Sequence, residues 1–160
     1  MAEEQEIGKI LTYEEAGIGM EFPDYVFVIT EELVREYAKL MGEEHPVMTD
    51  SKAAKEAGYS DIVAVPTMMN SYAHFVAQIN GGGYARPGES FHSRSTFNFL
   101  NPVYPGDTIT SKMRVTDKWE RRAFQYLGFT IESWNQHGEK VAEKFHASVW
   151  PSEATQKKTD

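Results

Sequence analysis

Residues 66–80 read Pro-Thr-Met-Met-Asn-Ser-Tyr-Ala-His-Phe-Val-Ala-Gln-Ile-Asn, and three glycines follow them. A proline suits the first turn of a helix and a glycine run ends one, so this stretch predicts one continuous helix. Apolar side chains cover most of its circumference, which indicates burial on most sides. The polar residues form a single stripe at i, i+4 spacing: Asn70, His74 and Gln78.

The chain on the C-terminal side of this helix reads as strands. Apolar and polar residues alternate in several long stretches, which short turns separate, so we expect mostly antiparallel pairing. One further strand is predicted before the helix. The five expected strands span residues 25–29, 91–99, 109–119, 127–131 and 141–149.

Two shorter helices are expected on the N-terminal side. Thr30 is a suitable N-cap for a helix over residues 31–41, and Asp50 is one for a helix over residues 51–57. A buried helix followed by a meander of strands packs most economically when the sheet curves around it, which is an α+β arrangement called the hot-dog fold. We expect one such domain over residues 1–151 and a polar tail over residues 152–160.

Composition excludes several classes of function. The 160 residues carry a net charge of −8, which disfavours a nucleic-acid surface, and no apolar run is long enough to span a membrane. There is no cysteine and the five histidines are scattered, so no metal site is expected. No dinucleotide or phosphate-loop motif is present, so no cofactor is expected. An acidic N-terminus without a signal pattern favours the cytoplasm.

One constellation precedes the central helix. Residues 42–50 read Gly-Glu-Glu-His-Pro-Val-Met-Thr-Asp, and an Ala-rich stretch, a Gly-Tyr pair and Ile62-Val63-Ala64 follow them. Together with Tyr104-Pro105-Gly106-Asp107-Thr108 and the hairpin over residues 135–142, this order resembles the MaoC-like (R)-specific enoyl-CoA hydratases and 3-hydroxyacyl dehydratases. The resemblance is closest to the subgroup with the fatty-acid-synthase-type dehydratase N-terminal domain.

The departures from that family concern its catalytic residues. The resemblance places the family's catalytic Asp at Glu43 and its catalytic His at Met48, and a thioether cannot transfer a proton. His45 stands where the family has Asn. Glu43 and His45 are therefore candidates for a remodelled catalytic pair. Alternatively, Glu43 is a solvated carboxylate at a helix end, and His45 caps the C-terminal end of the helix over residues 31–41 by bonding its last carbonyls.

The resemblance implies a subunit that shapes the acyl pocket while a second hot-dog chain supplies the Asp and the His. Its substrate would be an acyl-CoA or acyl-carrier-protein thioester, and its assembly a homodimer, a heterodimer or a heterotetramer. The amide after the proline polarises the thioester carbonyl in that family, which assigns this role to Thr67. The candidate substrate-binding residues are Met48, Pro66, Thr67, Met68 and Phe97.

Three other functions stay open at this point. The chain could be a self-sufficient hydratase that uses Glu43 and His45, or a non-catalytic protein that binds acyl thioesters for regulation. A hot-dog thioesterase would need a carboxylate or an amide on the central helix, which offers only Asn70 and Gln78.

Overall fold

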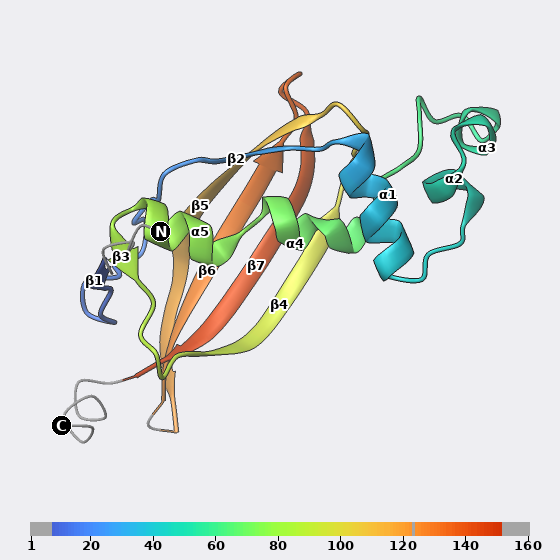
Figure 1. Ribbon diagram of the computed structural model, residues 1–160. Coiled ribbons are helices and arrows are strands. Elements are labelled where there is room, and N and C mark those ends of the chain that lie inside the picture. The colour runs from blue at the N-terminus through green and yellow to red at the C-terminus, as the bar shows by residue number, and fades with distance from the viewer. Residues whose placement is uncertain (1–7, 123, 152–160) are drawn as a thin grey trace, which may run out of the picture.

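The computed structural model describes residues 8–122 and 124–151. Its main element is an antiparallel sheet of five strands in the order β2-β5-β6-β7-β4. The sheet curves around one helical segment that lies across its concave face (Figure 1). The strands are β2 (Tyr25–Val28), β4 (Phe91–Phe99), β5 (Thr108–Arg121), β6 (Phe124–Trp134) and β7 (Lys140–Trp150). The predicted α+β hot-dog arrangement and its five strands are confirmed.

Two short strands form a separate parallel pair that the sequence did not predict. β1 (Lys9–Ile10) pairs with β3 (Tyr84–Ala85), which follows the glycine run. The predicted tail over residues 152–160 lies outside the described residues. The single-domain division stays a prediction.

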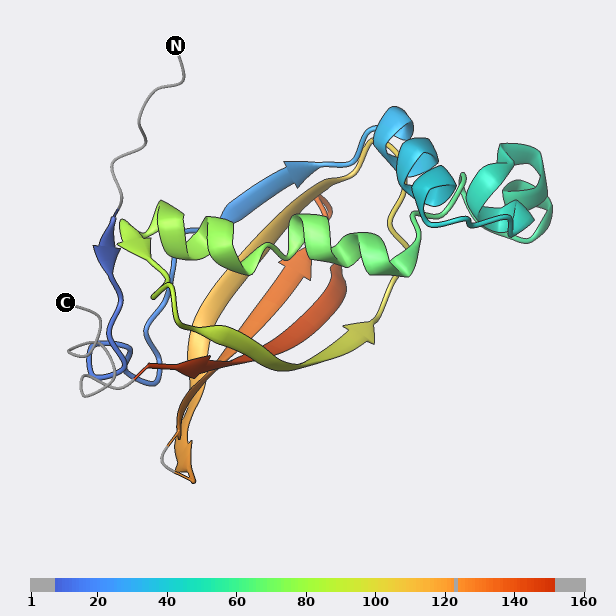
Figure 2. The same ribbon diagram turned by 60° about the horizontal axis from the view of Figure 1, so that its bottom comes forward.

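The helices before the central segment gather at one end of the sheet (Figure 2). They are α1 (Glu31–Leu40), α2 (Pro46–Thr49) and α3 (Ser51–Glu56). Thr30 caps α1 by accepting a hydrogen bond from the Leu33 amide, and Asp50 caps α3 by accepting one from the Ala53 amide. These two hydrogen bonds confirm both predicted caps. Short polar side chains are favoured at this position because they satisfy amides that the first turn of a helix leaves free.

The central segment is not the continuous helix that residues 66–80 predict. It consists of a 3₁₀ turn η1 (Pro66–Met68), α4 (Met69–Tyr72) and α5 (Phe75–Gly81), with a break at Ala73, where φ is −94° and ψ is 60°. The His74 ring caps α5 by accepting a hydrogen bond from the Ala77 amide over 3.0 Å. Lys144 of β7 donates to the Ala73 carbonyl, which the break leaves without its helical partner.

The break also removes the predicted polar stripe. Gln78 is buried and donates to the Ser111 carbonyl over 2.9 Å, whereas Asn70 is exposed and accepts from Lys144 over 3.1 Å. With His74 used as a cap, the three residues have three separate structural roles. They do not form one surface.

Aromatic packing joins α5 to the sheet. The Phe129 ring in β6 lies 4.8 Å from that of Phe75 in an edge-to-face arrangement. It also lies 6.1 Å from the Phe22 ring and 6.0 Å from the Trp150 ring. The Trp150 indole donates to the Leu11 carbonyl over 2.7 Å, which fixes the N-terminal segment against the same cluster. This cluster fixes the position of the helical segment over the sheet.

β4 is an edge strand, and a β-bulge interrupts the alternation of its side chains between the two faces of the sheet. The pairing with β7 shifts between His92 and Arg94, so Ser93 is an extra, bulged residue. As a result His92 lies on the same face as Ser95, to which it is hydrogen-bonded over 2.9 Å. The side chains of β4 are almost all exposed, although three of them are phenylalanines.

Candidate functional site

A cavity of about 380 Å³ lies where the α2–α3 region meets the start of the central segment. Met48 borders it from α2, Pro66 from η1 and Tyr72 from α4. Phe99 closes it from the end of β4 and Val141 from β7. Its lining is mostly apolar with a few polar groups, which is the usual character of a small-molecule site. We call it the inner cavity.

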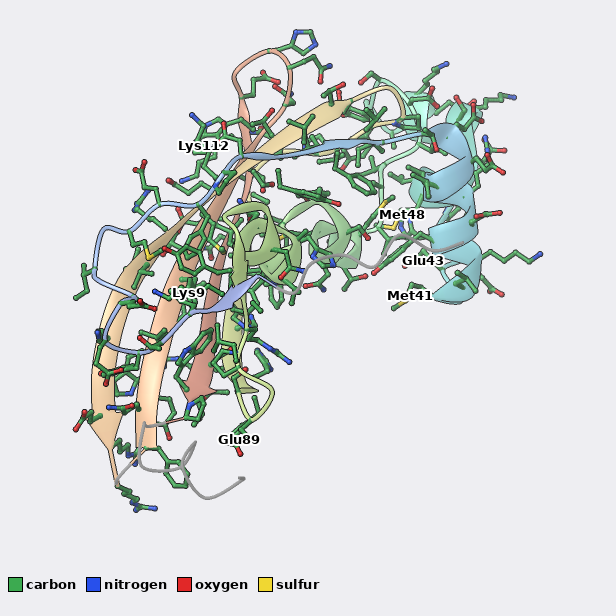
Figure 3. All side chains as sticks on the ribbon, turned by 60° about the vertical axis from the view of Figure 1, so that its left-hand side comes forward. Lys9, Met41, Glu43, Met48, Glu89 and Lys112 are labelled. Carbon is green, nitrogen blue, oxygen red and sulfur yellow. The ribbon has the colours of Figure 1, made fainter. Side chains whose placement is uncertain are left out.

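A second cavity of about 350 Å³ lies between α1 and α2, and we call it the outer cavity. Arg35, Lys39 and Glu43 border it, and so does Met48. Figure 3 shows Met48 and Glu43 beside α1, on the side that faces the central segment. Met48 is therefore the side chain that the inner and outer cavities have in common.

Glu43 and His45 do not meet through their side chains. A Glu43 carboxylate oxygen accepts a hydrogen bond from the backbone amide of His45 over 2.8 Å. The His45 ring caps the start of α2, because its Nδ1 accepts from the Val47 amide over 3.3 Å. The prediction that it caps the end of the preceding helix is therefore wrong, since α1 ends at Leu40 with Met41 as its C-cap. Glu43 borders the outer cavity and His45 borders the inner one. The carboxylate and the imidazole thus border different cavities.

Pro66 and Thr67 form the start of the central segment. Within the described residues, no group accepts a hydrogen bond from the Thr67 amide, which is exposed. The Thr67 hydroxyl accepts a hydrogen bond from the Tyr37 hydroxyl of α1 over 3.2 Å, which fixes the turn from one side. The turn therefore offers one free backbone donor near Pro66, a residue of the inner cavity.

The two remaining candidates lie outside the cavity lining. Met68 is buried in the core, and Phe97 lies over Lys144, with the ammonium 5.6 Å from the ring centroid. Phe99, two residues further along β4, borders the inner cavity in place of Phe97. The sequence carries no signal for Val141, because only the pairing of β4 with β7 brings it to the cavity.

A buried polar cluster lies between β4, β7 and the break in the central segment. Burial lowers the pKa of Lys144, and it lowers the pKa of His146 to about 3, so this ring is neutral near pH 7. His146 stacks on Phe75 at 4.2 Å and bonds the Ser148 hydroxyl over 2.9 Å. Lys144 supports the break in the helix through its hydrogen bond to the Ala73 carbonyl, and none of Lys144, His146 and Ser148 borders the inner cavity.

Two searches of the described residues are negative. Residues 8–122 and 124–151 contain no group of three or more His, Cys, Asp or Glu side chains that could hold a metal ion. None of the helices in that part of the chain has both the length and the apolar character needed to cross a membrane.

The sequence matches a model of the FAS1-like dehydratase domain region over residues 16–144. The chain belongs to this family. The matched part includes α1, the cavity residues and most of the sheet, so the resemblance stated from the motifs is confirmed at the level of the family.

Its curated relatives are bacterial proteins named UPF0336. One from Clavibacter michiganensis is 34% identical over 96 residues, which are 56% of this chain and 62% of that protein. One from Saccharopolyspora erythraea is 29% identical over 131 residues, which are 78% of this chain and 82% of that protein. The match to the Clavibacter relative thus covers less than two thirds of that protein.

Three solved structures share the fold. A monoamine oxidase regulatory protein from Archaeoglobus superposes with a TM-score of 0.78, at 23% identity over 89% of this chain and 95% of that one. A MaoC-like dehydratase gives 0.75, at 22% identity over 88% of this chain and 44% of that one. The third is a 3R-hydroxyacyl-ACP dehydratase complex, HadBC from Mycobacterium tuberculosis. One of its chains superposes with a TM-score of 0.72 at 25% identity, over 82% of this chain and 96% of that one.

Proposed function

We propose that this chain is the pocket-forming subunit of a MaoC-like acyl-thioester hydratase or dehydratase. The reaction is the reversible addition of water to a trans-2-enoyl thioester, which gives the 3-hydroxyacyl thioester. A second hot-dog subunit supplies the Asp and the His, and this chain supplies the wall of the acyl site. The thioester carrier is CoA or acyl carrier protein, and we place the protein in the cytoplasm.

The observation that carries this proposal is the position of Met48. By resemblance this residue replaces the catalytic His, and it lies at the border of the inner and outer cavities. Hydration of an enoyl thioester needs a base that activates water and an acid near the α-carbon. A thioether can do neither, but it is flexible and polarisable and suits the wall of an acyl site. The position that holds the catalytic His in the family thus carries a side chain that cannot transfer a proton.

The substrate-binding residues follow from the same arrangement. We assign the thioester carbonyl to the free amide of Thr67, since a fixed backbone donor polarises a carbonyl without reorganisation. Pro66 and Met48 contact the acyl group in the inner cavity. Met68 supports the turn from the core, and Phe97 holds the strand that carries Phe99.

The main alternative is a self-sufficient enzyme that uses Glu43 and His45. His45 borders the inner cavity, and its Nε2 has no hydrogen-bond partner among the described residues, which favours this alternative. The Glu43 carboxylate, however, is hydrogen-bonded to a backbone amide. A third possibility is a regulatory protein that binds acyl thioesters without turnover. These functions differ in whether the chain gives turnover alone, only with a second subunit, or in neither case.

A hydration assay separates the three functions. We expect the full chain alone to give no turnover of crotonyl-CoA or longer trans-2-enoyl-CoAs, measured by loss of enoyl absorbance. Addition of a MaoC-like subunit with an intact Asp and His is expected to give turnover above that of the added subunit alone. Turnover by the chain alone that Glu43→Ala abolishes would instead establish the self-sufficient enzyme. Binding without turnover in every combination would establish the regulator.

The edge strand β4 is the surface that we propose for the second subunit. An unpaired edge exposes backbone donors and acceptors that another strand can pair with. Phe91, Phe99 and Leu100 add large exposed apolar side chains along this edge. HadBC, which shares the fold, is itself a complex. The partner is a second copy of this chain or a homologous hot-dog subunit.

Phe91→Glu is expected to weaken this association at least about 10-fold, because it places a charge at the apolar edge. Sedimentation equilibrium of the purified protein, alone and with the added subunit, measures the change. Phe124→Glu is the matched control, since Phe91 and Phe124 are both 53% exposed and Phe124 lies at the start of β6. Equal association of the wild type and both variants would contradict the use of the β4 edge.

A further inference from the structure

Lys144 is a buried cation beside the open edge of the sheet. It lies in β7, pairs with Phe97 of the edge strand β4, and is 6% exposed. Its ammonium donates to the Asn70 side-chain oxygen over 3.1 Å and to the Ala73 carbonyl over 3.5 Å, and it lies 5.6 Å from the centroid of the Phe97 ring. Since Asn70 and Phe97 are exposed, these contacts place the ammonium just below the rim between the central segment and β4.

The groups that surround the Lys144 ammonium are uncharged. Burial lowers its pKa, and none of the carboxylates in residues 8–122 and 124–151 forms an ion pair with it or raises that pKa. Buried lysines are almost always paired with an opposite charge, because neutral acceptors offset only part of the cost of removing a charge from water. The described part of the chain therefore does not supply the counter-charge of Lys144.

The other charges near this edge are also basic. Arg86 and His92 are exposed, and both lower the pKa of the buried His146 ring by like-charge repulsion. Residues 90–106, which include all of β4, contain no Asp or Glu, although the 160 residues contain 24 of them; Glu89 is the last one before this stretch. A chain with a net charge of −8 thus has a basic edge at β4.

A second copy of this chain does not complement such an edge. In a symmetric dimer through β4, the same surface patch of both copies is placed face to face, so basic groups would meet basic groups. Facing like charges disfavour an interface, whereas opposite charges favour association and select the partner. The charge of the edge therefore favours a partner that differs from this chain.

We propose that the β4 edge binds a hot-dog subunit different from this chain, and that a carboxylate of this partner forms an ion pair with Lys144 at the rim between β4 and the central segment. This inference rests on the proposed function, which requires a second hot-dog subunit and does not choose between a copy and a homologue. It adds the chemistry that makes the choice, an acidic surface that faces β4. The exposed phenylalanines provide contact area, and the charges decide which subunit pairs.

The first test uses an acidic-edge probe, which is this full chain with Arg86→Glu, His92→Glu and Arg94→Glu. All three side chains are exposed, so the probe is expected to fold. Sedimentation equilibrium compares the wild type alone, the probe alone and their equimolar mixture. We expect the mixture to associate at least about 10-fold more tightly than either protein alone, and about 0.5 M NaCl to remove most of this difference by screening.

The second test measures Lys144→Met, which keeps a flexible apolar stem and removes the charge. We expect it to bind the MaoC-like subunit of the hydration assay about 10-fold more weakly than the wild type does. Lys112→Met is the matched control, since Lys112 also lies near an aromatic ring, 5.9 Å from that of Trp134, and belongs to β5, which β6 and β7 separate from β4. Circular dichroism checks that both variants are folded.

The outcomes separate this inference from the proposed function. Self-association of the wild type that is as tight as that of the mixture and insensitive to salt would overturn charge selection, and it would leave the hydration assay to decide the function. Equal binding of the MaoC-like subunit by Lys144→Met and Lys112→Met would overturn the ion pair. Failure of Lys144→Met to fold would leave the decision to the mixture with the probe. Absence of turnover with the added subunit would contradict the proposed function, whatever the mixture shows.

Discussion

The combined variant Glu43→Asp, His45→Asn and Met48→His is expected to give the full chain a hydration rate at least about 100-fold above the background rate without protein, because a positioned general acid or base contributes about 10²–10⁴-fold. The change restores the residues that the resembled family uses at these positions. Asn is a good N-cap, so α2 is expected to keep its start when His45 is replaced. Hydration of crotonyl-CoA by the variant alone measures the gain.

The same variant with Met48→Gln in place of Met48→His is the control. Glutamine has nearly the size of histidine and hydrogen-bonds, but it does not transfer protons near neutral pH. It is expected to stay at the wild-type rate. Equal rates for both variants and the wild type would show that the border of the two cavities is not the place where water adds to the enoyl group.

Phe129→Ala is expected to lower the free energy of unfolding by about 4 kcal/mol, because it removes a fully buried ring from a packed aromatic cluster. This is a large share of the roughly 5–15 kcal/mol that stabilises a domain. Urea denaturation followed by tryptophan fluorescence measures the change.

Phe124→Ala is the control for this stability measurement, since it removes an equal ring that is exposed. Its effect is expected to stay within about 0.5 kcal/mol. A loss below about 1 kcal/mol for Phe129→Ala would mean that the aromatic cluster is not what fixes the central segment to the sheet.

Local patterns predicted most of the fold. Thr30 and Asp50 sit directly before apolar helical repeats, and both act as the caps that their positions indicate. The strands were predictable because alternation is visible within each strand by itself. The predictions failed where contacts with residues far away in the sequence determine the local structure. The helix breaks at Ala73, whose carbonyl accepts from Lys144, and the bulge at Ser93 follows from the pairing of β4 with β7.

The sequence also predicted part of the candidate site. Met48 and Pro66 belong to a contiguous motif and both border the inner cavity. Phe97 and Phe99 alternate onto the same face of the predicted strand, so the sequence does not determine which of them borders the inner cavity, and the structure places Phe99 there. The separation of Glu43 from His45 depends on the start of α2, where the imidazole is used as a cap. Spacing along the sequence does not determine such orientations.

The break at Ala73 also matters for how such proteins can diverge. The segment before it, η1 and α4, borders the inner cavity, and the segment after it, α5, packs on the aromatic cluster. A continuous helix would transmit any shift of one half to the other as a rigid rod. Because the break interrupts the hydrogen bonding of the helix, we expect substitutions around the inner cavity to disturb the packing of α5 less than they would in one continuous helix.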